Sequence, residues 1–174
     1  MFFATRKILE MDESLTLVEI ENRAGVALNR LRYVIDSKIL PGNRDRATVW
    51  QARRGVARKF TKFEAFGIVV TVLLLDHGVK RNVVMQVMDL LCDYTKPKTR
   101  DLRYMPLYSA FLDKTVTALQ IGDGVNMRLC ANQPDVGGLP ANAWLQVVTR
   151  ARIEQFAPLV VMEINLTRLR EIWN

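Results

Sequence analysis

The sequence predicts an α+β fold in two parts, an N-terminal domain of residues 1–94 and a small mixed α/β domain of residues 95–174. Two observations support this division. Apolar residues recur at helical spacing through most of the first part, whereas in the second part they form short runs around the hairpin sequence Gly122-Asp123-Gly124. The stretch 95–106 between them is polar and contains prolines, which is typical of a domain boundary.

The composition is that of a packed protein. Of the 174 residues, 49% are hydrophobic and 25% are charged, and the longest apolar run, Phe66–Leu75, is too short to cross a bilayer. The first residues carry charges where a secretory signal would need an apolar stretch. We therefore expect a cytoplasmic protein with no membrane partner, in which Cys92 and Cys130 are reduced thiols.

Four helices are predicted in the N-terminal domain. The first follows Thr16, a plausible N-cap that forms a capping box with Glu19, and ends at Gly25. The second runs over residues 27–38 and stops before Pro41-Gly42, so the first pair has the pattern of a helix-turn-helix. Residues 61–78 and 79–94 predict the third and fourth helices, the third with a second capping box at its start.

Residues 43–60 lack helical periodicity and are rich in Arg. We interpret them as a basic β-hairpin, with strands at Thr48–Trp50 and Val56–Phe60. A basic hairpin after a helix-turn-helix predicts a winged helix-turn-helix of four helices plus a β-hairpin wing.

The C-terminal domain is predicted from shorter signals. We expect two strands within residues 116–130, a helix at 141–156, a strand at 158–166 and a short helix at 167–173. We expect its role to be dimerisation, with effector binding and protein contact as the alternatives.

The positive charge is concentrated in one segment. From Arg23 to Lys62, eight Arg and three Lys stand against only Asp36 and Asp45, a net of +9, so the rest of the chain carries −2 of the total of +7. An Arg-rich block of this kind is the electrostatic footprint expected of a nucleic-acid contact. A solvated basic surface or a membrane-surface patch is the alternative.

One side of the helix over residues 27–38 is suited to reading DNA. Opposite the apolar stripe of Leu28, Leu31 and Ile35 lie polar residues that can bond base edges or phosphates, namely Asn29, Arg30, Arg32 and Tyr33, with Asp36 beside them. Taken alone, this face would fit an ordinary surface helix equally well. The adjacent wing adds candidate phosphate contacts at Arg44, Arg46, Arg53, Arg54, Arg58 and Lys59.

Residues 15–92 resemble the DNA-binding domain of MerR-type regulators. The resemblance rests on short motifs in the family's order: Gly25-Val26, Leu31-Arg32-Tyr33, Ile39-Leu40, Arg58, Phe60 and Gly78-Val79. Ala27 stands where the family has an N-cap Ser, Val34 replaces its second Tyr, and no long dimerising helix follows Leu91. The resemblance implies DNA binding through a winged helix-turn-helix.

No catalytic or metal site is predicted. Cys92, Cys130 and the single His77 do not make a ligand set, and Asp123, Asp135 and Glu163 show no recognisable pairing. We therefore expect a non-enzymatic, nucleoid-associated regulator of transcription without a cofactor, which binds double-stranded DNA as a homodimer. Two alternatives stay open, a DNA-architectural or recombination accessory factor and a protein-interaction module that uses the same fold.

Overall fold

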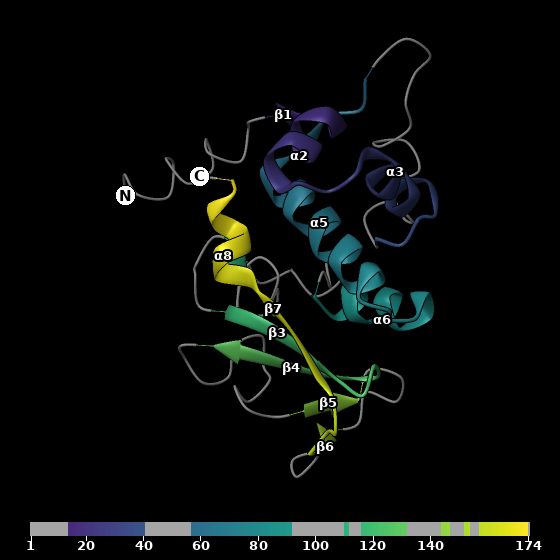
Figure 1. The fold of residues 1–174 in the computed structure, drawn as a ribbon, viewed down its shortest axis with the longest axis vertical. Coiled ribbons are helices and arrows are strands. Elements are labelled where there is room, and N and C mark those ends of the chain that lie inside the picture. The colour runs from purple at the N-terminus through teal and green to yellow at the C-terminus, as the bar shows by residue number, and fades with distance from the viewer. Residues whose placement is uncertain are drawn as a thin grey trace, which may run out of the picture.

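The computed structural model describes residues 14–40, 57–91, 110–111, 116–131, 144–146, 152–153 and 157–173 (Figure 1). The helices are α2 (Leu17–Ala24), α3 (Leu28–Asp36), α5 (Lys62–Asp76), α6 (Arg81–Leu91) and α8 (Leu166–Glu171). The strands are β1 (Ser14–Leu15), β2 (Phe60–Thr61), β3 (Val116–Gly122), β4 (Asn126–Ala131), β5 (Trp144–Gln146), β6 (Arg152–Ile153) and β7 (Val161–Asn165). This mixture of helices and antiparallel sheets confirms the predicted α+β class.

Both predicted capping boxes form. The Thr16 hydroxyl accepts the backbone N–H of Glu19 at 3.3 Å, and the Glu19 carboxylate accepts the N–H of Thr16 at 2.6 Å. Thr61 and Glu64 make the same reciprocal pair at the start of α5, at 3.2 and 2.8 Å. These bonds satisfy N–H groups that have no partner within a helix, so local sequence determines where α2 and α5 begin.

Helix α3 ends at Asp36 and not at Lys38 as predicted. The Lys38 N–H donates to the Ile35 carbonyl and the Ile39 N–H to the Val34 carbonyl, which is a Schellman ending. Lys38 occupies the left-handed position of this motif, with φ of 51°. The same ending closes α5 with a glycine, Gly78, at φ of 83°.

A two-stranded antiparallel sheet joins the residues before α2 to the residues before α5. Strand β1 pairs with β2 through Ser14 opposite Thr61 and Leu15 opposite Phe60. Of the described part of the predicted strand Val56–Phe60, Phe60 lies in a strand and Ala57–Lys59 do not. Residues 41–56, which hold the rest of the predicted wing, and the predicted boundary at 95–106 lie outside the described residues.

The second sheet has five strands in the order β6-β5-β4-β3-β7. The predicted hairpin is confirmed, since β3 and β4 are joined by a turn in which Asp123 and Gly124 have φ of 49° and 73°. The strand and helix predicted at the C-terminal end are also confirmed as β7 and α8. The helix predicted at 141–156 is wrong, because this region contains β5 and β6, which extend the sheet from β4.

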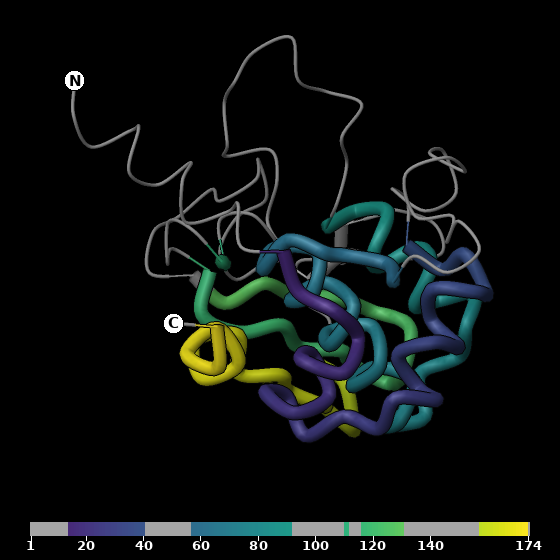
Figure 2. Tube along the Cα trace, turned by 90° about the horizontal axis from the view of Figure 1, so that it is seen from above, coloured from purple at the N-terminus to yellow at the C-terminus, as the bar shows by residue number. Residues whose placement is uncertain are grey.

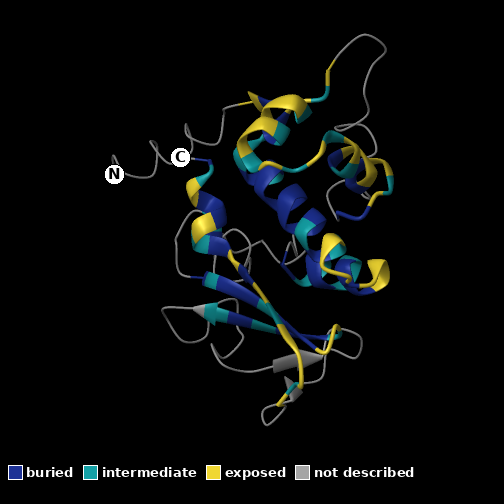
Figure 3. Ribbon diagram, viewed as in Figure 1, coloured by how far each residue is buried: buried dark blue, intermediate teal, exposed yellow. Residues whose placement is uncertain are grey.

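The helices and the five-stranded sheet share a core. Figures 1 and 2 show the N-terminal helices on one side of the sheet, with α8 beside α5. The buried apolar side chains of both parts form one cluster, which includes Phe66 of α5, Leu119 of β3 and Trp173 after α8. Figure 3 shows α5 as the most deeply buried helix, while α2 and α3 each keep an exposed side. One side of helix α3 therefore packs on the core, and its other side is exposed to solvent.

Candidate nucleic-acid interface

Helix α3 lies with one side in the core and the other on the surface. Leu31, Val34 and Ile35 are buried. Asn29, Arg32 and Tyr33 of the predicted recognition face are exposed, as the helical periodicity requires.

The start of α3 is capped from the neighbouring helix. Ala27 occupies the N-cap position and has no side chain that could accept a hydrogen bond. The Glu21 carboxylate of α2 instead accepts the backbone N–H of Leu28 at 2.9 Å. A negative charge at a helix N-terminus is also favourable for the helix dipole. Glu21 thereby fixes the turn and the relative position of the two helices.

Arg30 makes two contacts within the protein. Its guanidinium forms an ion pair with Asp76, the last residue of α5, and lies over the Tyr33 ring with Cζ 5.8 Å from the ring centroid. The side chains of Arg30 and Asp76 are 38% and 41% exposed, so this pair sits at the surface. Arg30 is thus part of the exposed face, but it is held by a neighbouring helix.

Two arginines hold the C-terminal end of α3. Arg58 Nη1 lies 2.8 Å from Asp36 Oδ1, and Arg81 of α6 donates to the Ser37 carbonyl at 2.8 Å. Both contacts bring a cation to the end of the helix where carbonyl groups and Asp36 gather negative charge. Arg58, predicted as a phosphate contact, is therefore also an ion-pair partner of α3.

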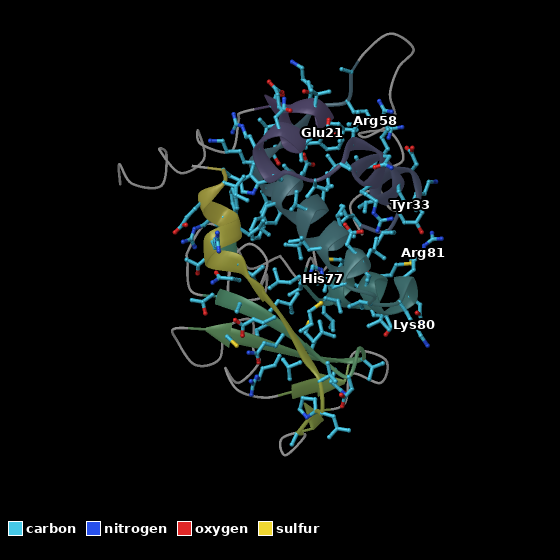
Figure 4. The ribbon with its side chains drawn as sticks, viewed as in Figure 1. Glu21, Tyr33, Arg58, His77, Lys80 and Arg81 are labelled. Carbon is cyan, nitrogen blue, oxygen red and sulfur yellow. The ribbon has the colours of Figure 1, made fainter. Side chains whose placement is uncertain are left out.

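Three further cations lie beside this helix and are not among the predicted site residues. Lys38, Lys80 and Arg81 are all exposed. Figure 4 shows one side of the molecule occupied by Arg58, Tyr33, Arg81 and Lys80. Lys80 and Arg81 lie outside the basic block at 23–62, so counting charge along the chain did not select them. Lys38 lies within the block, but it belongs to the end of the predicted helix and is not among the predicted contacts.

We call this exposed surface the α3 face. Its described members are Asn29, Arg30, Arg32, Tyr33, Lys38, Arg58, Lys59, Lys80 and Arg81. Lys59 is exposed next to β2. The predicted contacts Arg44, Arg46, Arg53 and Arg54 lie outside the described residues.

A second surface feature is an open groove of about 620 Å³ between the end of α5 and α8. Its described lining includes Leu73, His77, Arg168 and Leu169, and none of the described lining residues is a Ser, Thr or Cys. His77 Nδ1 lies 2.8 Å from the Leu73 carbonyl oxygen, within its own helix end.

Two other features, a helix able to span a membrane and a cluster of metal ligands, are absent from the described residues. None of the described helices has the length and apolar character needed to cross a membrane. Among the described residues, no group of three or more His, Cys, Asp or Glu side chains is placed to hold a metal ion. Cys130 is a free thiol whose pKa is raised by its partial burial, against the opposing influence of Arg128.

Comparison of the chain with protein families, with curated proteins and with solved structures finds no match in any of the three.

Proposed function

We propose that this protein is a non-enzymatic, sequence-preferring regulator of transcription that binds double-stranded DNA in the cytoplasm, with α3 in the major groove. One observation carries the proposal: α3 is held by contacts from α2, α5 and α6, yet exposes Asn29, Arg32 and Tyr33. A helix fixed in this way with polar side chains outward is suited to entering a groove as a rigid unit.

The exposed residue types match the chemistry of base edges. Asn can bond adenine through two hydrogen bonds, and Arg can do the same with guanine. Tyr33 can donate its hydroxyl to a phosphate oxygen while its ring supports Arg30. We assign sequence preference to Asn29, Arg30 and Arg32, and orientation on the duplex to Tyr33.

The surrounding cations provide affinity that does not depend on sequence. Lys38 and Lys59 extend the α3 face, and Lys80 and Arg81 add charge from the start of α6. The predicted wing contacts at 44–54 would add further phosphate contacts next to Lys59. Each phosphate neutralised releases counterions, so binding should weaken as salt rises. The β1–β2 pairing supports the winged-helix interpretation, since it attaches the end of the predicted wing to the residues before α2.

We also propose that two copies bind together through the outer edge of β7. No described strand pairs with this edge, and the residues entering it are apolar and exposed: Leu159 at 97%, Val160 at 68% and Val161 at 45%. Natural sheets usually protect such an edge with charge, proline or a covering element.

The backbone of this edge is self-complementary. The Val160 carbonyl accepts the backbone N–H of Asp123 at 2.9 Å, and the Val160 N–H donates to Asp123 Oδ1 at 3.0 Å. The backbone polar groups of Val160 therefore point into the sheet. Because backbone groups alternate along a strand, those of Val161 and Glu163 point outward. A twofold axis at Val161 would pair the outward N–H and carbonyl of Val161 with those of Val161 in the second copy. A second copy would supply the second recognition helix that a two-half-site operator needs.

The proposal is tested by selecting duplexes from a random library and titrating the selected and scrambled sites. Arg32→Ala should reduce the preference for the selected site, while Lys80→Ala should weaken both duplexes equally. Arg168→Ala, which removes a charge from exposed α8 surface, is the matched control and should change neither. Loss of equal size on both duplexes for Arg32→Ala would overturn the role assigned to α3. Strong bending of the selected site would favour the architectural alternative.

A further inference from the structure

Arg30 is a residue of α3 itself whose acidic partner lies on a different helix, α5. Its Nη2 group is paired with Asp76 Oδ1, and its guanidinium lies over Tyr33. The two contacts restrain a long side chain that would otherwise sample many rotamers.

Asp76 projects from a rigid support. It is the last residue of α5, and the neighbouring Val72 and Leu74 are fully buried. The helix ends directly afterwards in the Schellman motif with Gly78 at its left-handed position. The position of the carboxylate is therefore set by the core and not by a loose surface segment.

The pair is poorly placed to serve stability. With 38% and 41% of the side chains exposed, water and salt screen the attraction, and such pairs add little to the free energy of unfolding. Its geometric effect is larger, since an Arg that reads a base must present its planar donors in one orientation.

We propose that Asp76 is a specificity-determining positioning residue, which holds Arg30 so that its remaining donors face a guanine in the major groove. Arg has five N–H donors, and the contact to one Asp76 oxygen leaves donors for the O6 and N7 acceptors of guanine. Tyr33 supports the plane of the guanidinium from one face. This inference rests on the proposed function.

The chain offers a matched control for charge. Asp36 is also ion-paired with an Arg on the α3 face, through Arg58, and its side chain is 61% exposed. Asp76→Asn and Asp36→Asn each remove one negative charge near the proposed DNA, so both change non-specific attraction in the same direction. Only Asp76→Asn removes the restraint on Arg30.

The experiment measures Kd for the selected duplex and for a duplex in which the guanine contacted by Arg30 is replaced by another base. Dividing the Kd of the replaced duplex by that of the selected duplex gives the preference. Asp76→Asn is expected to reduce this preference about tenfold, while Asp36→Asn leaves it unchanged. In an Arg30→Lys background, which lacks the planar fork, Asp76→Asn should change the ratio no further. Thermal unfolding of each variant establishes that it is folded.

The contrary results are distinct. An unchanged or higher ratio for Asp76→Asn would show that Asp76 only competes with DNA for Arg30, and would overturn this inference alone. Absence of any duplex binding or preference by the unmodified protein would overturn the proposed function together with it.

Discussion

The Glu21 carboxylate accepts a 2.9 Å hydrogen bond from the backbone N–H of Leu28 and thereby caps α3 from α2. Seven positions separate these residues, and the turn between them contains Gly25 in the left-handed conformation, with φ of 65°. The absence of a capping side chain at Ala27 is thus compensated by a residue of the preceding helix.

Removing this cap should destabilise the protein. Glu21→Ala is expected to lower the free energy of unfolding by about 1 kcal/mol, because the Leu28 N–H loses its acceptor. Adding Ala27→Ser should restore much of the loss by supplying a local cap. Denaturant unfolding of the four proteins in this cycle measures both effects. Strictly additive changes would show that Glu21 does not act as the cap of α3.

Lys38 is expected to lower the stability of the protein while contributing to its affinity for DNA. Lys38→Gly should raise the free energy of unfolding by about 1 kcal/mol, because glycine adopts the left-handed position without steric penalty. The same change should weaken DNA binding and reduce the slope of log Kd against log salt by about one, if Lys38 contacts a phosphate. Lys38→Ala is the control for charge, with the affinity loss but no gain in stability. Equal affinity of all three proteins would remove Lys38 from the interface.

The outer edge of β7 should determine oligomeric state. Val161→Glu is expected to convert the dimer to a monomer, because two carboxylates would meet at the twofold axis. Sedimentation equilibrium measures the mass in solution. The control is Val18→Glu on α2, where a valine of similar exposure, 52%, is replaced away from β7. A dimer that survives Val161→Glu, or an unmodified protein that is monomeric, would exclude this interface.

The sequence predicted the N-terminal helices well because their signals are local. Each capping box and each glycine ending involves residues a few positions apart. The structure contains the capping boxes of α2 and α5 and the glycine endings at Gly25 and Gly78. The turn at Asp123-Gly124 was recognisable for the same reason. The helix predicted at 141–156 is wrong because the apolar run of this segment fits either a helix or a strand, and its strands are stabilised by sheet pairing, β5 with β4 and β6 with β5.

The site divides in the same way. The exposed positions of α3 followed from helical periodicity, which needs only the sequence of that helix. The partners Asp76 and Arg81 could not be predicted, because they lie 46 and 44 positions from the residues they bond. Only the packing of α5 and α6 against α3 brings them to this face.

The most direct test of the central claim is fluorescence anisotropy of a labelled random duplex titrated with the unmodified protein at increasing salt. The account predicts binding at low salt that weakens steeply, with a slope of log Kd against log salt corresponding to several neutralised phosphates. A negligible signal even at low salt would contradict it and would assign the α3 face to an acidic protein partner instead.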